Sequence, residues 1–248
     1  MFNLNILSAE ASGFFAVLNE QLRQNFVVAD RWKLYLGGLG VTLKVTALSM
    51  LIGLVLGTLV ATVRSSYEMK LESERSAVLK ILNLICKIYT TVIRGTPVLV
   101  QLLIFYFVIF TTSRNPAAIA ILAFGINSGA YVAEIVRGGI MAVDRGQMEA
   151  GRSLGFGYAA TMRLIIIPQA VKAILPSIGN EFIALIKETS VVSVIGLRDL
   201  TKAAQLIGGK TYQFFVPFIL IALVYLLLVM IFTKLLEKLE GRLRSSER

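Results

Sequence analysis

Three stretches of the chain are long enough to cross a lipid bilayer and contain no charged residue. They are Val45–Val63, Gly95–Ser113 and Thr211–Thr233. A membrane-spanning helix needs about 20 predominantly apolar residues, so each stretch suffices. Hydrophobic residues make up 56% of the chain and charged residues 16%, whereas a soluble domain averages about 45–50% and about 25%. The sequence therefore predicts an all-α integral membrane protein.

Two further segments complete a predicted set of five spans. Asn115–Ala133 carries no charge but has polar residues in its middle, and Ala170–Ile195 stays mostly apolar despite four charged residues. The spans are expected at about residues 39–64, 78–112, 115–138, 170–196 and 211–236. Gly95 and Pro97 are expected to place a kink or break inside the second span, because proline interrupts helical hydrogen bonding.

Basic residues near the span ends predict the orientation. They gather after the first span, between the third and fourth, and after the fifth, whereas the loop between the second and third holds only Arg114. Arg198, Lys202 and Lys210 oppose this bias without cancelling it. The positive-inside rule then puts the N-terminus outside and the C-terminus in the cytoplasm. Residues 1–33 are expected to form an amphipathic surface segment, residues 34–240 the transmembrane domain, and residues 241–248 a basic cytoplasmic tail.

The composition excludes several kinds of chemistry. The chain has no histidine and one cysteine, Cys86, which excludes a histidine-based triad, a zinc site of the His or Cys type, histidine-ligated haem and an intrachain disulfide. The formal charge of +10 comes without a nucleic-acid-binding motif, so basic loops explain it better. No phosphate-binding loop of the G-x-x-x-x-G-K-[ST] kind is present. We expect this chain to bind no metal or cofactor and to hydrolyse no ATP.

A loop between the third and fourth spans, Met141–Val171, does not belong to the bilayer. Asp144 is a predicted N-cap for a short helix over about Arg145–Leu154, which Gly155 and Gly157 are expected to end. A second amphipathic run, Tyr158–Ile167, leads to a proline. A helix–glycine–helix element on the membrane surface has the form of a docking surface, although an ordinary helical loop would look the same.

The residues of this loop carry a resemblance. Glu149, Ala150 and Gly151 are followed after three residues by Gly155, after nine more by Ile165, and then by Ile167 and Pro168. This spacing resembles the EAA signature of bacterial ABC importer permeases, with Gly151 in place of alanine and Ile167 in place of leucine. Further segments resemble the polar amino-acid branch of that family: Gly40–Leu43, Arg94–Gln101, Ser128–Gly139, Pro168–Ala170, Asn180–Phe182 and Lys187–Ser190. The resemblance runs from about Tyr35 to Glu240.

The resemblance implies a five-span permease subunit in the bacterial inner membrane. Its implied partners are a second permease chain (identical or homologous), a dimer of ATPase subunits that uses ATP and Mg²⁺, and an extracytoplasmic amino-acid-binding protein. The implied ATPase-coupling residues are Glu149, Ala150, Gly151, Gly155, Ile165 and Pro168. An ion-gradient-driven secondary amino-acid transporter is the alternative, although such proteins usually show two repeated halves. A channel filter and a catalytic set of acids and bases are not recognisable.

Polar residues at membrane depth are candidates for the substrate path, because they usually face a protein interior or a water-filled cavity. The candidates are Arg94, Thr96, Gln101, Glu134, Asn180, Glu181 and Lys187. Glu134 has two equally good predicted partners, Arg94 and Arg137. Glu181 either binds the substrate ammonium group or makes a structural hydrogen bond to the partner subunit. Acidic, basic, amide and cystine-type substrates all stay open.

Overall fold

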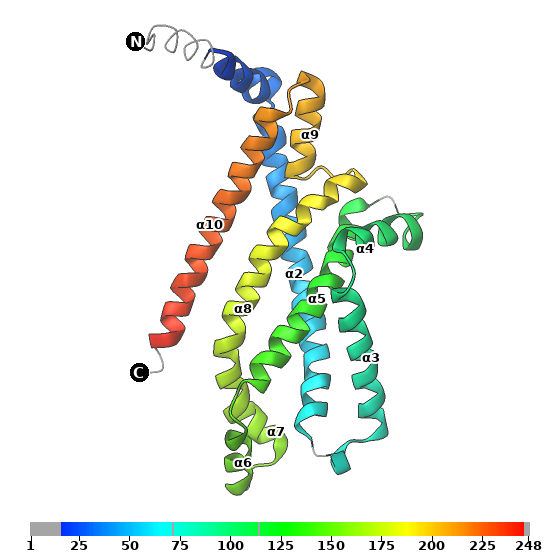
Figure 1. Cartoon of the computed structure of the whole chain (residues 1–248), viewed down its shortest axis with the longest axis vertical. Helices are drawn as coiled ribbons and strands as arrows, with labels where there is room; N and C mark the ends of the chain where they lie inside the picture. The colour runs from blue at the N-terminus through cyan, green and yellow to red at the C-terminus, as the bar shows by residue number, and fades with distance from the viewer. Residues whose placement is uncertain (1–15, 71, 114, 246–248) are drawn as a thin grey trace, which may run out of the picture. The chain divides into compact units, whose positions relative to one another are not determined.

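The computed structural model describes residues 16–70, 72–113 and 115–245, and every regular element in them is a helix (Figure 1). The all-α prediction is therefore confirmed for this part of the chain. It divides into two compact units, one made of residues up to 44 and 190–228, the other of residues 45–189 and those from 229 onward. Residues 1–15 of the predicted amphipathic segment, Arg114 and Arg248 lie outside the described residues.

The first unit contains a short helix that the sequence did not predict. After a helical segment at 16–22, a π-helical turn at Arg23–Val27 and a 3₁₀ turn at Val28–Asp30, the chain enters α2 (Trp32–Met69). The unpredicted helix is α9 (Leu200–Thr211), and α10 (Phe215–Ser245) follows it. Buried apolar side chains from α2, α9 and α10 form one core: Tyr35, Leu200, Ala203, Ala204, Ile207 and Ile221.

A buried acidic cap fixes the start of α9. The Asp199 carboxylate accepts hydrogen bonds from the backbone amides of Thr201 (3.1 Å) and Lys202 (2.8 Å). Burial raises the pKa of Asp199, and these amide donors oppose that shift. Gly38 lets α2 approach closely, since a Cβ there would lie 2.6 Å from the Asp199 carbonyl oxygen. The cap and the close contact together hold α9 against α2.

In the second unit, α5 (Pro116–Met141) lies against three other helical segments. It packs on α3 (Ala77–Arg94), α4 (Val98–Ile104) and α8 (Ile167–Glu188). Small residues let α2 come close as well, because a Cβ on Gly57 would lie 2.6 Å from the Val132 Cβ. Close packing through glycine is a usual way for membrane helices to associate.

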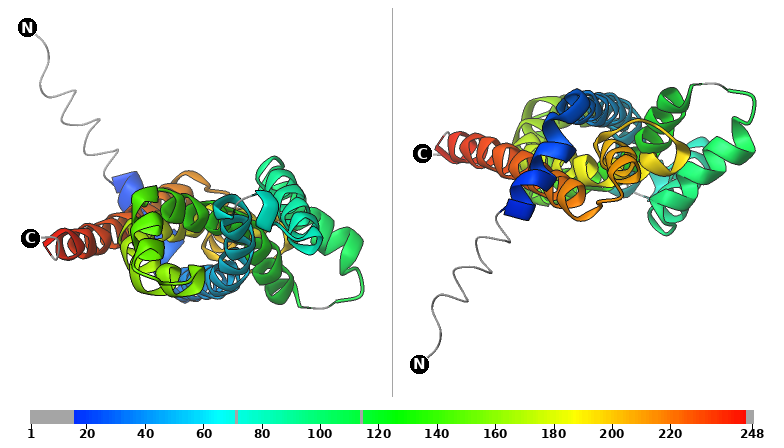
Figure 2. Two further views of the ribbon diagram at one scale, coloured as in Figure 1. Left: turned by 90° about the horizontal axis from the view of Figure 1, so that it is seen from below. Right: turned by 90° about the horizontal axis from the view of Figure 1, so that it is seen from above.

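The predicted break in the second span is present and sharp. Val98–Ile109, which comprises α4 and a π-helical turn, is bent by 105° from α3. As a result α4 projects sideways from the other helices of its unit (Figures 1 and 2). In the described residues, four helices are long and apolar enough to cross a membrane, or five if the bent pair counts as one span.

Several boundaries differ from the predicted ones. Helix α2 extends beyond the predicted span 39–64 at both ends. Helix α10 begins at Phe215 rather than at residue 211, because Tyr212 takes a left-handed conformation (φ 56°) that ends α9. The same helix continues to Ser245, so residues 241–245 of the predicted tail are helical.

Candidate functional site

The first helix of the loop after α5 is built as predicted. Helix α6 (Arg145–Ser153) starts at Asp144, whose side chain accepts a hydrogen bond of 2.6 Å from the Gly146 amide. At its other end the Phe156 amide donates to the Gly151 carbonyl (3.0 Å) and the Gly155 amide to the Arg152 carbonyl (2.9 Å). This pair of bonds is a Schellman motif. It requires a left-handed residue, and Gly155 supplies it with φ +85°.

Gly151 occupies the position where the resembled signature has alanine, and its surroundings explain the difference. A Cβ at Gly151 would lie 2.5 Å from the Thr161 Cγ2 and 2.8 Å from its Oγ1. Thr161 is fully buried and ends α7 (Tyr158–Thr161). Glycine at this position therefore permits the close packing of α6 on α7.

The second amphipathic run does not stop at its proline. Helix α7, a π-helical turn at Met162–Ile166 and α8 follow one another without a gap, so Tyr158–Ile195 is one continuous candidate span. Pro168 is the second residue of α8, which begins directly after the π-helical turn. Pro168 is exposed and Ile165 is partly buried. The second loop helix is thus the beginning of the fourth predicted span.

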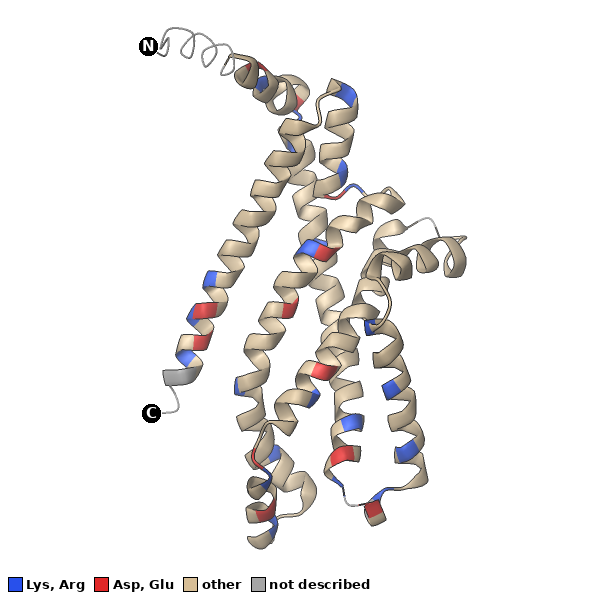
Figure 3. Ribbon diagram, viewed as in Figure 1, with Lys and Arg blue, Asp and Glu red and all other residues tan. Residues whose placement is uncertain are grey.

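One surface of this loop offers both charged and apolar side chains. Glu149 and Ala150 are exposed, and Leu154 and Phe156 at the end of α6 are 74% and 40% exposed. A cavity of about 390 Å³ lies beside α6, and charged residues from α2, α6 and the segment after α2 line it. Figure 3 shows charged residues in the parts of α2 and α5 that lie toward α6 and α7, whereas those of α3 are spread along the helix.

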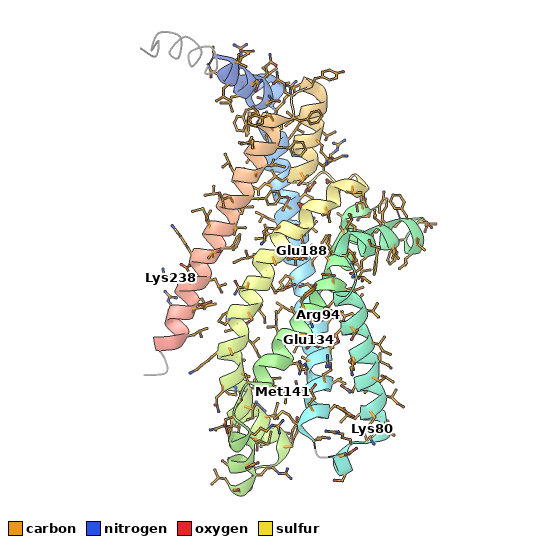
Figure 4. The ribbon with its side chains drawn as sticks, in the orientation of Figure 1. Lys80, Arg94, Glu134, Met141, Glu188 and Lys238 are labelled. Carbon is orange, nitrogen blue, oxygen red and sulfur yellow. The ribbon has the colours of Figure 1, made fainter. Side chains whose placement is uncertain are left out.

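The structure decides between the two predicted partners of Glu134. Its carboxylate binds Arg137, with distances of 2.8 and 3.0 Å to the guanidinium, and also binds Arg64 of α2. The Arg137 alternative is therefore confirmed, and the Arg94 alternative is wrong. Arg94 instead lies over the ring of Tyr131, 5.3 Å from its centre. Figure 4 labels Arg94 near the end of α3 and Glu134 on α5.

Gln101 and Thr96 hold the helix break together. The Gln101 amide nitrogen donates to the Ile93 carbonyl (2.8 Å) and to the Thr96 hydroxyl (2.7 Å). The Gln101 amide oxygen accepts a 2.9 Å hydrogen bond from Asn127 of α5. Gln101 and Asn127 are both buried, so this network satisfies polar groups that the break exposes. Gln101 thereby ties the bent helix to α5.

Glu181 has a partner within the same chain. Its Oε1 accepts a 2.8 Å hydrogen bond from the Ser128 hydroxyl of α5. This contact lies within the chain, and the two predicted alternatives for Glu181, the substrate ammonium group and a partner subunit, stay predictions. Glu188 and Arg94 are the charged groups that act on Glu181 electrostatically, and no ion pair within 4 Å joins Glu181 to either in the described residues. Asn180 and Lys187, on the same helix, are exposed.

The sequence matches a known family over most of its length. Residues 75–245 match the model of the family described as the binding-protein-dependent transport system inner membrane component. The chain belongs to this family. It is therefore a multi-pass membrane protein and a transport-system permease, in agreement with the prediction from the EAA-like loop.

Curated members of the family are similar over nearly their whole length. A putative glutamine transport system permease protein of Rickettsia bellii is 40% identical over 82% of this chain and 89% of its own. An arginine transport system permease protein of Bacillus subtilis is 39% identical over 86% of this chain and 93% of its own. These similarities support the assignment to the amino-acid branch of the permease family.

Solved structures of ABC transporters also resemble this chain. The chain resembles a crystal structure of an amino acid ABC transporter with histidines, with a TM-score of 0.77 and 45% identity over 85% of this chain and 94% of that one. An inward-facing methionine ABC transporter shares the fold, with a TM-score of 0.71 at 16% identity and coverage of 87% and 98%.

Two residues that make buried polar contacts in the permease, Arg64 and Ser128, were not among the predicted site residues. The sequence indicates only that Arg64 is a basic residue at the end of the first predicted span, yet it binds Glu134 and lies 3.7 Å from Glu68. Its spacing of four residues from Glu68 on one helix was the available signal. Ser128 and its contact with Glu181 had no signal in the sequence, because that contact depends on how α5 and α8 pack.

Proposed function

We propose that this chain is the permease subunit of an ATP-driven importer for a polar amino acid. The observation that carries the proposal is the built loop of α6 and α7, with its Schellman turn at Gly155, in a member of the binding-protein-dependent permease family. Relatives named as glutamine, arginine and L-cystine permeases support an amino acid as the substrate class. Nothing in these features favours an ion-gradient-driven secondary transporter.

The exposed side of the loop is the proposed contact with an ATPase subunit. Glu149 offers a carboxylate, and Leu154 and Phe156 offer apolar surface beside it. A mixed surface of this kind suits a groove in a partner protein. The ATPase dimer would bind ATP and Mg²⁺, a second permease chain would complete the path, and an extracytoplasmic protein would deliver the amino acid.

The α6–α7 loop connects the end of α5 to the start of α8. Helix α5 ends at Met141, three residues before the N-cap of α6 (Figure 4). Helix α7 leads without a gap into α8, and Gly151 packs on Thr161 between the two loop helices. A displacement of α6 would therefore move α5 and α8 as a rigid-body shift.

Glu181 and Arg94 suit the two ends of a zwitterion. They have opposite charges, act on one another electrostatically and form no direct ion pair in the described residues. An amino acid between them would bring its ammonium group to Glu181 and its carboxylate to Arg94. The nearby helix break resembles the broken helices at which transporters commonly bind substrates.

The function can be tested with the complex reconstituted in vesicles. The permease, its ATPase subunits and the binding protein should take up one of radiolabelled glutamine, arginine or cystine when ATP is supplied. Uptake should stop when the phosphate-binding lysine of the ATPase is replaced. Uptake that continues in that variant and follows an imposed ion gradient would overturn the proposal.

Cysteine labelling tests the proposed orientation. In a Cys86→Ala background that retains uptake, Ser73→Cys should react with a membrane-impermeant maleimide only from the cytoplasmic side. Thr112→Cys should react only from the outside, since both positions are exposed on opposite sides of the second span. The reverse pattern would place the α6–α7 loop outside, away from any cytoplasmic ATPase.

Replacement of Glu181 with glutamine tests the substrate contact. Glutamine keeps the size of the side chain but removes the charge, so the apparent affinity for the amino acid should fall about tenfold to a hundredfold, the effect of about 1.5–3 kcal/mol from a charge-assisted hydrogen bond. Uptake measured against substrate concentration gives this value. Glu188→Gln, on the same helix, is the matched control and should change the affinity much less. A complex that fails to assemble with Glu181→Gln would make Glu181 structural.

A further inference from the structure

Four charged side chains from α2 and α5 form a closed ring with alternating signs. Arg64 binds Glu134, Glu134 binds Arg137 at 2.8 Å, Arg137 binds Glu68 at 3.0 Å, and Glu68 returns to Arg64 at 3.7 Å. Two of these contacts lie within a helix, and two cross from α2 to α5. Each arginine therefore contacts both carboxylates, and the ring has no net charge.

The ring is largely removed from solvent. The side chains of Arg64 and Glu134 are 13% and 17% exposed, and those of Arg137 and Glu68 are 25% and 29% exposed. Arg64 also donates a 3.2 Å hydrogen bond to the hydroxyl of Thr90, which lies on α3 and is buried. Charged groups at this depth are costly unless they are paired, so the loss of one member would leave a charge without its partner. The ring thus links three helices.

The ring lies next to the loop that we assign to coupling. Arg137 and Glu134 are in the last two turns of α5, which ends four residues after Arg137 and leads into α6. Glu68 also lines the cavity beside α6, together with Glu149, Arg145 and Arg152 of that helix. Glu68 therefore belongs to the charged ring and also lines the cavity beside α6.

We propose that Arg64, Glu68, Glu134 and Arg137 form a clamp that transmits the movement of α6 through α5 to α2 and α3. The inference rests on the proposed function. When α6 moves with the ATPase subunits, α5 moves with it, and the two charge contacts across to α2 make that helix follow. Thr90 extends the same connection to α3, which leads to the helix break at Gly95. Glu68 and Arg137 act as positioning residues and need not touch the substrate.

Charge reversal at one cross-helix contact tests the clamp. Glu68→Arg and Arg137→Glu should each lower the number of amino acids taken up per ATP hydrolysed by about tenfold or more in the assembled complex, because each leaves like charges facing one another. The double variant restores an opposite-charge contact between α2 and α5 and the zero net charge of the ring, but it leaves like charges side by side within each helix. Its ratio should therefore rise above that of either single variant without reaching the wild-type value. Lys80→Glu, an exposed charge reversal on α3, is the control and should leave the ratio unchanged.

Milder variants cover the case in which charge reversal prevents assembly. Glu68→Gln removes one charge, and Arg137→Lys keeps its charge but cannot contact both carboxylates through a planar fork. Both should assemble and transport fewer amino acids per ATP. Wild-type ratios in both variants, or a double reversal no better than the single ones, would overturn the clamp. A wild-type complex without ATP-dependent uptake would instead overturn the proposed function.

Discussion

The Gly155→Val variant should lose substrate-stimulated ATP hydrolysis while the permease remains in the membrane and assembled. Gly155 has φ +85° and closes the Schellman turn at the end of α6. A branched side chain in this left-handed conformation costs about 1–2 kcal/mol. No atom beyond Gly155 and its two chain neighbours lies within 4 Å of an added Cβ, so the strain comes from the backbone conformation and is relieved by a change in the turn. The end of α6 would then no longer fit the proposed ATPase groove.

Gly157→Val is the matched control for this variant. Gly157 is two residues away and also has no atom within 4 Å of an added Cβ, but its φ of −70° is open to any residue. ATP hydrolysis is measured with and without the loaded binding protein, and co-purification of the ATPase subunit reports docking. Wild-type stimulation in Gly155→Val would mean that Met141–Val171 is only a linker.

The spans could be predicted from the sequence because the bilayer imposes a local requirement. About 20 apolar residues are needed for each crossing, so a window of hydropathy finds them without knowledge of their neighbours. The break at Gly95 and Pro97 is equally local, because a proline interrupts helical hydrogen bonding whatever its neighbours are. The sequence could not give the bend of 105°, because Gln101 and Asn127 hold it through a contact between helices.

Local rules also predicted the α6–α7 loop, including its cap at Asp144 and its turn at Gly155. The sequence around α9 carries the same local signals. Asp199 is a good N-cap, and the buried residues Leu200, Ala203, Ala204 and Ile207 follow it at helical spacing.

Contacts between helices were the least predictable part of the site. Arg94 and Arg137 were equally good partners for Glu134 by reach alone, and the packing of α2 on α5 added Arg64 as a third. Gly57 allows that packing, yet nothing local shows which face of α2 it brings to α5. For the same reason, the sequence does not predict the hydrogen bond between Ser128 and Glu181. The register of one helix against another depends on both sequences together.

Replacement of Glu149 with lysine should release the proposed ATPase subunit during purification and abolish stimulated ATP hydrolysis. Glu149 is exposed on α6 and has no ion pair within 4 Å in the part of the chain that the structure describes. Its carboxylate is therefore available to a cation on a partner protein. Reversal of that charge creates repulsion in place of attraction, and loss of a buried charge pair in an interface costs about 2–5 kcal/mol, or roughly thirtyfold to several thousandfold in affinity.

Glu72→Lys separates this effect from a general change of charge. Glu72 is also exposed and lines the same cavity as Glu149, but it belongs to the turn after α2 rather than to α6. If α6 is the docking helix, Glu72→Lys should keep the ATPase subunit bound, and Glu149→Gln should show an intermediate loss. Equal loss in the Glu72 and Glu149 variants would mean that the ATPase senses the overall charge of this surface. Full retention in Glu149→Lys would remove α6 from the contact, because a docking helix cannot reverse its exposed charge without effect.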